Sequence, residues 1–169
     1  MAETDAWEGS AGIIGSYRDH DLHARVGTII REHSRNRRDI RSVVRDAVPW
    51  PRVKSVLDVG CGYGWFEQVM PEGLDLIVGV DCLAENEAPF LAVAAARARD
   101  AAFRVVTLPA PTGLPSNHFD LVLSLYSLYF FPGAVGEMAR VLKPGGLFLS
   151  LTHSVSMLEE GQHYFDFRN

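Results

Sequence analysis

Three glycines follow an acid in one short segment of this 169-residue sequence, Asp58-Val59-Gly60-Cys61-Gly62-Tyr63-Gly64. Glycine lets a backbone turn sharply and approach a ligand without a Cβ clash. Asp58, two residues before the first glycine, can attract an ammonium group directly or through water. Asp81 follows the apolar run Ile77-Val78-Gly79-Val80, where a carboxylate can accept both hydroxyls of a ribose. The two acids therefore fit a ligand in which a nucleoside is attached to an amino acid.

The glycine spacing also argues against a dinucleotide as the ligand. The dinucleotide fingerprint is G-x-G-x-x-G, whereas Trp65 stands here in place of its third glycine. A nicotinamide oxidoreductase is the competing interpretation at the level of the fold, and competition by NAD would favour it. Three purely structural interpretations also stand: Asp58 caps the loop, Asp81 is an ordinary strand-end acid, and Cys61 is chosen for its size.

The surrounding sequence predicts the elements that position these residues. Short β-branched runs predict five buried strands, over residues 53–59, 74–80, 103–108, 119–125 and 146–151. Helical patterns lie between them, over residues 65–70, 89–100 and 133–142. This alternation predicts an α/β fold with a doubly wound, Rossmann-like parallel sheet covered on both faces. The glycine loop would lie at the carboxyl ends of the strands, with a helix N-terminus behind it that offers amides to a carboxylate.

The N-terminal third carries its own pattern. We predict a flexible arm over residues 1–20 and a single domain over residues 21–169. Within that domain we expect N-terminal helices over 21–48, a cofactor-binding core over 53–152 and a short tail over 153–169. Ser34 is the expected cap of a second helix, and Pro49-Trp50-Pro51 ends the helical structure.

Four motifs resemble those of class I S-adenosylmethionine-dependent methyltransferases, in that family's order and nearly at its spacing. They are Val56-Leu57-Asp58-Val59-Gly60-Cys61-Gly62-Tyr63-Gly64, Gly79-Val80-Asp81, Leu114-Pro115 with Phe119-Asp120-Leu121-Val122-Leu123-Ser124, and Glu137-Met138-Ala139-Arg140-Val141-Leu142-Lys143-Pro144-Gly145-Gly146. The resemblance covers about residues 53–152 and implies S-adenosyl-L-methionine as cofactor. By that resemblance Gly60, Cys61 and Gly62 would line the methionine part, Asp81 would hold the ribose, Cys82 and Leu83 would lie beside the adenine, and the backbone of Ser124 or Leu125 would face the methionine amino group. Asp58 is the acid expected to attract that amino group by its charge.

Two features depart from the family pattern. Ala110 stands near the place where members often carry an acid that binds adenine, so backbone groups or Thr112 are expected to do so here. The family's sheet also normally ends in an antiparallel pair of strands, and the sequence after Leu151 has no room for them. We expect these strands to be missing because the sequence is a fragment or trimmed form. The alternative is a homodimer in which a second copy completes the open sheet edge.

The predicted reaction is methyl transfer by in-line displacement to an O, N or C nucleophile of a small molecule. Candidate residues for the acceptor pocket are Tyr17, His20, His23, Tyr126 and Tyr129. His153, just past the fifth predicted strand, is the candidate general base. Each candidate also has a structural alternative. The aromatic run 125–131 could pack against the sheet, and His20 and His23 could lie on the surface of a helix.

A basic stripe suggests a second function. Arginines recur at helical spacing at positions 31, 35, 38, 41 and 45, which would suit an RNA or protein methyltransferase that contacts phosphates or acids. A solvated helix face paired with Glu32, Asp39 and Asp46 is the alternative, and the net charge of −5 for the whole chain argues against a broad RNA surface. A third interpretation is a non-catalytic partner domain of an active methyltransferase.

The bulk composition sets outer limits. The hydrophobic fraction of 47% and charged fraction of 22% are typical of a soluble globular protein. No apolar run approaches the roughly 20 residues that a membrane span needs, and the N-terminus lacks a secretory pattern. The 2 cysteines lack disulfide-framework and metal-site spacing. We therefore predict a cytoplasmic protein with no metal site and no membrane partner.

Overall fold

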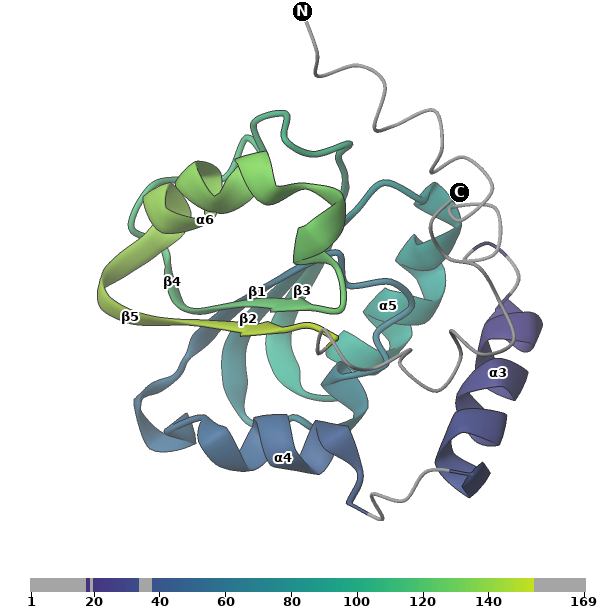
Figure 1. Cartoon of the computed structure of the whole chain (residues 1–169). Helices are drawn as coiled ribbons and strands as arrows, with labels where there is room; N and C mark the ends of the chain where they lie inside the picture. Colours follow the sequence, from purple (N-terminus) through teal and green to yellow (C-terminus); the bar gives the residue numbers. More distant parts are fainter. Residues whose placement is uncertain (1–17, 19, 34–37, 154–169) are drawn as a thin grey trace, which may run out of the picture. The chain divides into compact units, whose positions relative to one another are not determined.

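The computed structural model describes residues 18, 20–33 and 38–153 (Figure 1). The chain divides into two compact units, residues 1–48 and 49–169. The N-terminal unit contains α3 (His20–His33) and α4 (Ile40–Ala47). Asp39 caps α4, because its Oδ1 accepts the backbone N–H of Arg41 at 2.9 Å, whereas the expected cap Ser34 lies outside the described residues. The predicted arm also falls almost entirely outside them, and a single domain over residues 21–169 stays a prediction.

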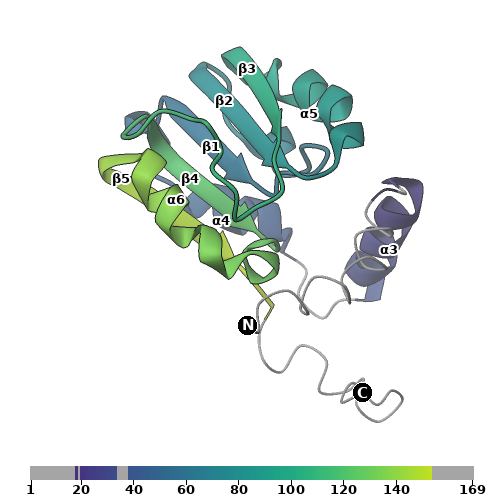
Figure 2. The same cartoon turned by 90° about the horizontal axis from the view of Figure 1, so that it is seen from above.

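The C-terminal unit is built on a sheet of five parallel strands. These are β1 (Ser55–Val59), β2 (Leu74–Asp81), β3 (Ala98–Val105), β4 (Phe119–Leu125) and β5 (Leu142–Leu151), arranged in the order β3-β2-β1-β4-β5 (Figures 1 and 2). Every residue of the central strand β1 is buried, as its apolar run predicts. The order reverses beside β1, since β2 and β4 lie on either side of it, and this is where doubly wound sheets bind ligands.

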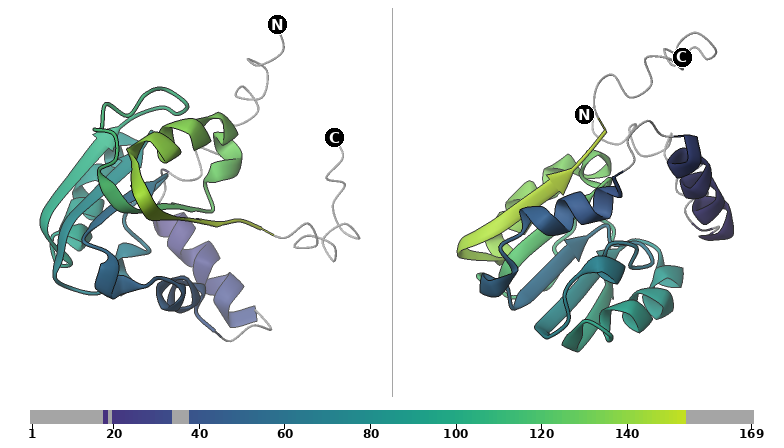
Figure 3. Two further views of the ribbon diagram at one scale, coloured as in Figure 1. Left: turned by 90° about the vertical axis from the view of Figure 1, so that its left-hand side faces the viewer. Right: turned by 90° about the horizontal axis from the view of Figure 1, so that it is seen from below.

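Helices cover both faces of the sheet. Successive residues of a strand point to opposite faces. Val78 and Val80 of β2 belong to an apolar cluster with residues of α6 (Val135–Val141), whereas Gly79 between them faces Phe90 of α5 (Glu87–Ala94). The predicted doubly wound, Rossmann-like fold with five parallel strands is therefore confirmed. The described residues contain no antiparallel strand, and β5 lies at the sheet edge (Figure 3).

Two strands begin earlier than predicted. β3 begins at Ala98 rather than at 103, and α5 correspondingly ends at Ala94 rather than at 100. The start of β3 carries exposed charges and forms by pairing with β2, where Leu74 lies opposite Ala98. An edge strand with charged residues lacks the apolar run on which the prediction relied. β5 begins at Leu142 rather than at 146, because an irregular stretch of the strand continues the pairing with β4.

The predicted helix over residues 65–70 is wrong. The chain there forms a single 3-10 turn, η2 (Glu67–Val69). Gly62 and Gly64 have φ angles of +54° and +84°, which no helix contains, and Pro71 follows soon after the turn. The expected helix N-terminus behind the glycine loop is therefore absent, and no row of helical amides is available there for a carboxylate.

Two residues of the family motifs hold the opposite end of the sheet together. Asp120 Oδ2 accepts the backbone N–H groups of Lys54 and Ser55, each at 2.9 Å, and Asp120 Oδ1 accepts Lys143 Nζ at 2.7 Å. These contacts join the amino ends of β1, β4 and β5. Asp120 and Lys143 thus stabilise the strands from the end away from the glycine loop.

We expect Asp120→Asn to lower the free energy of unfolding by about 2 kcal/mol near neutral pH, since it weakens hydrogen bonds to a charged group. Partial burial raises the pKa of Asp120, but hydrogen bonds from Lys143, Ser55 and Lys54 outweigh it and lower the pKa from 3.8 to about 2. The lowered pKa means that the carboxylate stabilises the fold above pH 3.8 and loses that effect as the pH falls towards about 2. Denaturant unfolding at several pH values should show the difference between variant and wild type shrinking over that window.

Asp100→Asn is the matched control, because Asp100 lies on β3 with a side chain that is 65% exposed. Its exposed pairing with Arg99 should contribute at most about 1 kcal/mol. A difference for Asp120→Asn that does not change with pH would contradict the role of its charge.

Candidate functional site

The carboxyl ends of β1 and β2 are tied together by the backbone of the glycine loop. The N–H groups of Gly60 and Cys61 both donate to the carbonyl oxygen of Val80, at 2.7 and 3.2 Å. Asp81 continues this connection, since its Oδ2 accepts Gly62 N–H and its Oδ1 accepts Leu83 N–H, each at 2.9 Å. Each carboxylate oxygen has a further lone pair, so Asp81 can also accept hydroxyl groups without releasing the loops.

Gly60 brings the loop after β4 against the loop after β1. Its φ is +76°, and a Cβ at this position would lie 2.4 Å from Ser127 Cβ. The Ser127 hydroxyl donates to the carbonyl oxygen of Val59 at 2.7 Å and pairs with the Ser124 hydroxyl at 2.8 Å. Sequence reasoning missed Ser127. The available signal was a small polar residue two positions after the end of β4, the strand next to β1.

Gly62 has a different environment. Its φ is +54°, and apart from Gly62 and its two chain neighbours no described atom lies within 4 Å of the position of a Cβ. The backbone of Gly62 therefore borders open space beside Asp81, as a loop that approaches a ligand requires.

Cys61 points away from that space. Its thiol is buried, and Sγ would lie 2.6 Å from a Cβ on Gly79 of the neighbouring strand. The pKa of the Cys61 thiol is raised well above its usual value. Burial is the largest cause, and the charges of Asp58, Glu67 and Asp81 add to it. These contacts favour the interpretation that Cys61 is chosen for its size, and they leave only its backbone to line a ligand.

A buried carboxyl pair lies behind the loop. Asp58 is 3% exposed and Glu67, the first residue of η2, is 0% exposed. Burial, and to a smaller extent the charge of Asp81, raise the pKa of Asp58 from 3.8 to about 6, although the Glu67 side chain and the Val59 N–H oppose the rise. Burial and the charge of Asp58 raise the pKa of Glu67 well above its usual value. Sequence reasoning missed Glu67, although an acid within the apolar segment Trp65-Phe66-Glu67-Gln68-Val69-Met70 was a signal.

The other predicted cofactor residues lie along the same edge of the sheet. Leu83 is buried and Cys82 half-buried, directly after Asp81. Ser124 is fully buried near the end of β4, and Leu125, the last residue of that strand, is half-buried. Their contacts with a cofactor stay predictions.

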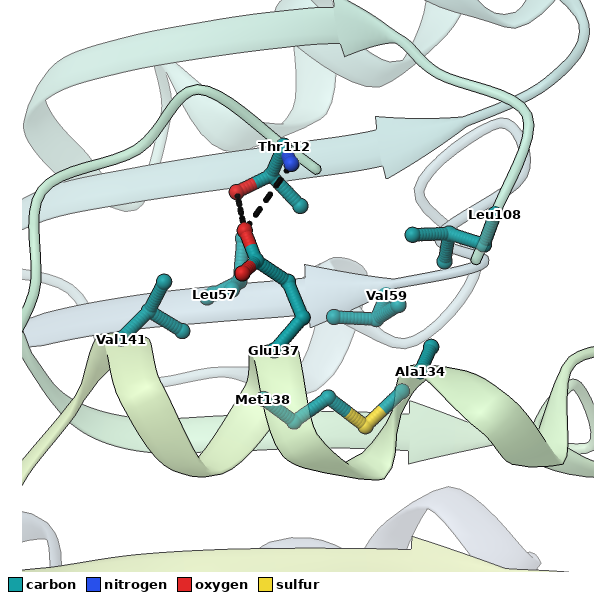
Figure 4. A pocket seen from close by; sticks show the side chains of 8 residues that line it. All are labelled: Leu57, Val59, Leu108, Thr112, Ala134, Glu137, Met138 and Val141. Atoms are coloured by element: carbon teal, nitrogen blue, oxygen red, sulfur yellow. Dashed lines mark hydrogen bonds between the residues drawn. The ribbon is translucent and has the colours of Figure 1, made fainter. Parts of the chain in front are cut away.

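Thr112 is buried and its side chain is turned towards α6. Its hydroxyl donates to Glu137 Oε1 at 2.6 Å and its backbone N–H donates to the same oxygen at 2.9 Å (Figure 4). Beneath this contact lies an apolar layer from the sheet, the loop and α6, made up of Leu57, Val59, Leu108, Ala134, Met138 and Val141. Hydrogen bonds from Arg140 and then from Thr112 lower the pKa of Glu137 to about 2, against the effect of burial. These contacts fix the Thr112 loop to α6, and a role of Thr112 in binding adenine stays a prediction.

Three predicted acceptor residues gather at the ends of β4 and β5. The rings of Tyr126 and His153 are stacked with centroids 4.6 Å apart, and Tyr129 lies 5.9 Å from His153. Tyr126 has a φ of +56°, a conformation uncommon for residues other than glycine and often found at functional sites. Its burial raises the pKa of the phenol. The cluster of Tyr126, Tyr129 and His153 is called the aromatic cluster below.

The remaining acceptor candidates belong to the N-terminal part of the chain. Tyr17 lies outside the described residues, and His20 and His23 belong to α3 of the N-terminal unit. A place for them in the acceptor pocket stays a prediction.

Three of the five arginines in the basic stripe are paired within their own helical region. Arg41 contacts Asp39 at 2.6 Å, Arg45 contacts Asp46 at 3.0 Å, and Arg38 lies 3.7 Å from Asp46. Arg35 lies outside the described residues. These ion pairs favour the solvated face over a phosphate-binding surface. Over the same described range, no helix combines the length and apolarity that crossing a membrane requires.

Comparison with known proteins identifies the family. Residues 57–150 match the model of a methyltransferase domain. The chain is 34% identical over 103 residues to aklanonic acid methyltransferase DauC of Streptomyces sp. (strain C5), a match that covers 54% of this chain and 44% of that protein. The chain therefore spans less than half the length of this relative.

Solved structures share the fold. The [4+2]-cyclase SpnF is 26% identical with a TM-score of 0.52, covering 66% of this chain and 43% of SpnF. A methyltransferase of Geobacter sulfurreducens, solved in complex with S-adenosyl-L-homocysteine, is 19% identical with a TM-score of 0.51, covering 75% of this chain and 54% of that one. The family model covers more than half of the sequence and includes both the glycine loop and the aromatic run after β4. The chain belongs to the methyltransferase domain family, whose cofactor is S-adenosylmethionine.

Proposed function

We propose that this chain binds S-adenosylmethionine at the carboxyl ends of β1, β2 and β4 and transfers its methyl group to a small-molecule acceptor. The contact between Gly60 and Ser127 carries this proposal. It brings the glycine loop directly against the segment that bears Tyr126 and Tyr129. A cofactor on the loop and an acceptor on the aromatic cluster would therefore be neighbours.

The residues present fit the cofactor at its two polar ends. Asp81 accepts the ribose hydroxyls on its remaining lone pairs, while Gly62 lets the backbone approach the methionine part. Asp58 supplies negative charge for the amino group, helped by the backbone of Ser124 or Leu125. Cys82 and Leu83 flank the adenine, whose amine is bound by backbone groups because no acid stands at Ala110.

The bound cofactor supplies a methyl group already activated on a sulfonium. The main task of the protein is then alignment, which can contribute roughly 7–11 kcal/mol in favourable cases. Tyr126 and Tyr129 provide flat apolar walls for the acceptor. His153, exposed beside them, accepts a proton from an acceptor that must lose one during attack.

We expect His153→Ala to lower the rate of methyl transfer about 100-fold, the lower end of the range for a general base. The affinity for S-adenosylmethionine should change less than about twofold, since His153 serves the acceptor side. Single-turnover transfer of labelled methyl, together with calorimetry of cofactor binding, measures the two effects separately. His118→Ala is the control, because His118 is exposed at the amino end of β4, before Phe119. Unchanged transfer by His153→Ala would remove His153 from the mechanism.

The acceptor class is testable with the wild-type protein. Labelled methyl should pass from the cofactor to a metabolite extract rather than to an RNA pool, as the paired arginines and the relative DauC favour. Transfer to RNA or protein would instead support the alternative. Cofactor binding without any transfer would support a partner domain or a different reaction, a possibility that the cyclase SpnF illustrates on this fold.

Completion of the sheet by a second copy is a further part of the proposal. β5 is the edge strand, and its Phe148 side chain is 38% exposed. An apolar edge strand favours pairing with another chain.

The cytoplasmic location is likewise a proposal.

A further inference from the structure

Glu67 occupies a position where the fold would accept an apolar side chain. It is fully buried between Phe66 and Met70, which are 2% and 1% exposed. Within the described part of the chain, no donor reaches Glu67 Oε1, Glu67 Oε2 or Asp58 Oδ1. An ionised carboxylate in such a place costs several kcal/mol unless it is paired with a cation or hydrogen-bonded. A carboxyl group that keeps its proton avoids that cost.

Among the described residues, the titratable groups that shift the pKa values of Glu67 and Asp58 supply no positive charge. They are Asp58 and Glu67 themselves and then Asp81, and all three also raise the pKa of the neighbouring Cys61 thiol. The Asp58 and Glu67 carboxyl groups interact closely enough to shift each other's pKa, and a hydrogen bond between two carboxyl groups requires a proton on one of them. Two interacting carboxyl groups that share one proton titrate as a pair.

We propose that Glu67 is a positioning residue of the cofactor site, which shares a proton with Asp58 and so sets the charge that Asp58 presents to the amino group of S-adenosylmethionine. This inference rests on the cofactor placement proposed above. The pair carries one negative charge when it holds one proton and none when it holds two. The ammonium of the cofactor favours the charged form, so binding displaces protons from the pair.

The sign of the pH dependence follows from this linkage. The pKa of Asp58 is about 6 in the free protein, and a nearby ammonium lowers it. The bound state therefore holds fewer protons than the free state, and affinity rises as the pH rises towards that value. The change is at most about tenfold per pH unit and levels off above it.

The test is calorimetry with S-adenosylmethionine from about pH 5 to about pH 8, in buffers of different ionisation enthalpy that report proton release. Wild type should release protons near pH 6 and bind more weakly below it. In Glu67→Gln the amide donates to Asp58 without a titrating proton, so the affinity should vary less than about twofold over this range. Glu72→Gln is the matched control, since the Glu72 side chain is 77% exposed, and it should behave as wild type.

A second measurement does not need the cofactor. Infrared spectra of the free protein at neutral pH should show the carbonyl band of a protonated carboxyl group, lost in Glu67→Gln and kept in Glu72→Gln. Absence of the band in wild type, or cofactor affinity that is independent of pH in wild type, would overturn the shared proton. Failure of wild type to bind S-adenosylmethionine at any pH would instead refute the proposed function, and with it the positioning role, whatever the infrared band shows.

Discussion

Asp81→Ala is expected to weaken the binding of S-adenosylmethionine about 100-fold. Each hydrogen bond to a charged group contributes about 1.5–3 kcal/mol, and the variant loses two such bonds to the ribose. In wild type the Asp81 carboxylate also accepts the Gly62 and Leu83 N–H groups, each at 2.9 Å. The variant loses these two hydrogen bonds, so both loops become less ordered. A loss of about 3 kcal/mol of binding free energy corresponds to a weakening of about 100-fold. Calorimetry measures this change in affinity directly.

Asp75→Ala is the control for this experiment. Asp75 lies on the same strand β2 but is exposed near its amino end, so cofactor affinity should match wild type. Asp81→Asn should be intermediate, because an amide retains one acceptor oxygen. Affinity of Asp81→Ala within about threefold of wild type would mean that the ribose lies elsewhere.

Gly60→Ala is expected to lower the free energy of unfolding by about 3 kcal/mol. The added Cβ would lie 2.4 Å from Ser127 Cβ and 2.6 Å from Ser127 Oγ. Such overpacking costs about 1–3 kcal/mol, and the φ of +76° adds about 1–2 kcal/mol for any residue other than glycine. Chemical denaturation should show the loss in the transition midpoint with an unchanged slope.

Gly62→Ala separates the two contributions. Its φ of +54° is also left-handed, but open space surrounds the Cβ position, so only the backbone term of about 1–2 kcal/mol applies. Equal costs for the two variants would contradict the tight contact between the loops after β1 and β4. A Gly62→Ala variant that folds but binds the cofactor poorly would support the close approach of the ligand at Gly62.

The sequence predicted well wherever the relevant signal is local. Apolar runs predicted the buried strands β1, β2 and β4 to within two residues at either end. The sequence did not predict where β3 begins, because this edge strand carries charged residues and forms by pairing with β2 rather than through an apolar pattern of its own. The sequence also failed to predict residues 65–70, where left-handed glycines just before the segment and a proline just after it limit the chain to one 3-10 turn.

For the candidate site, too, the sequence predicted what local patterns carry, and the tertiary structure decided the rest. Residue types and spacing alone singled out the glycine loop, Asp58 and Asp81, and the resemblance of four motifs led to the methyltransferase family. Only the tertiary structure showed that Ser127 packs on Gly60 and that the aromatic cluster brings Tyr126 to His153. It alone buried Glu67 beside Asp58 and turned Thr112 towards Glu137. Such contacts join residues far apart in the sequence, and their distances and burial depend on how strands and loops pack rather than on any local pattern.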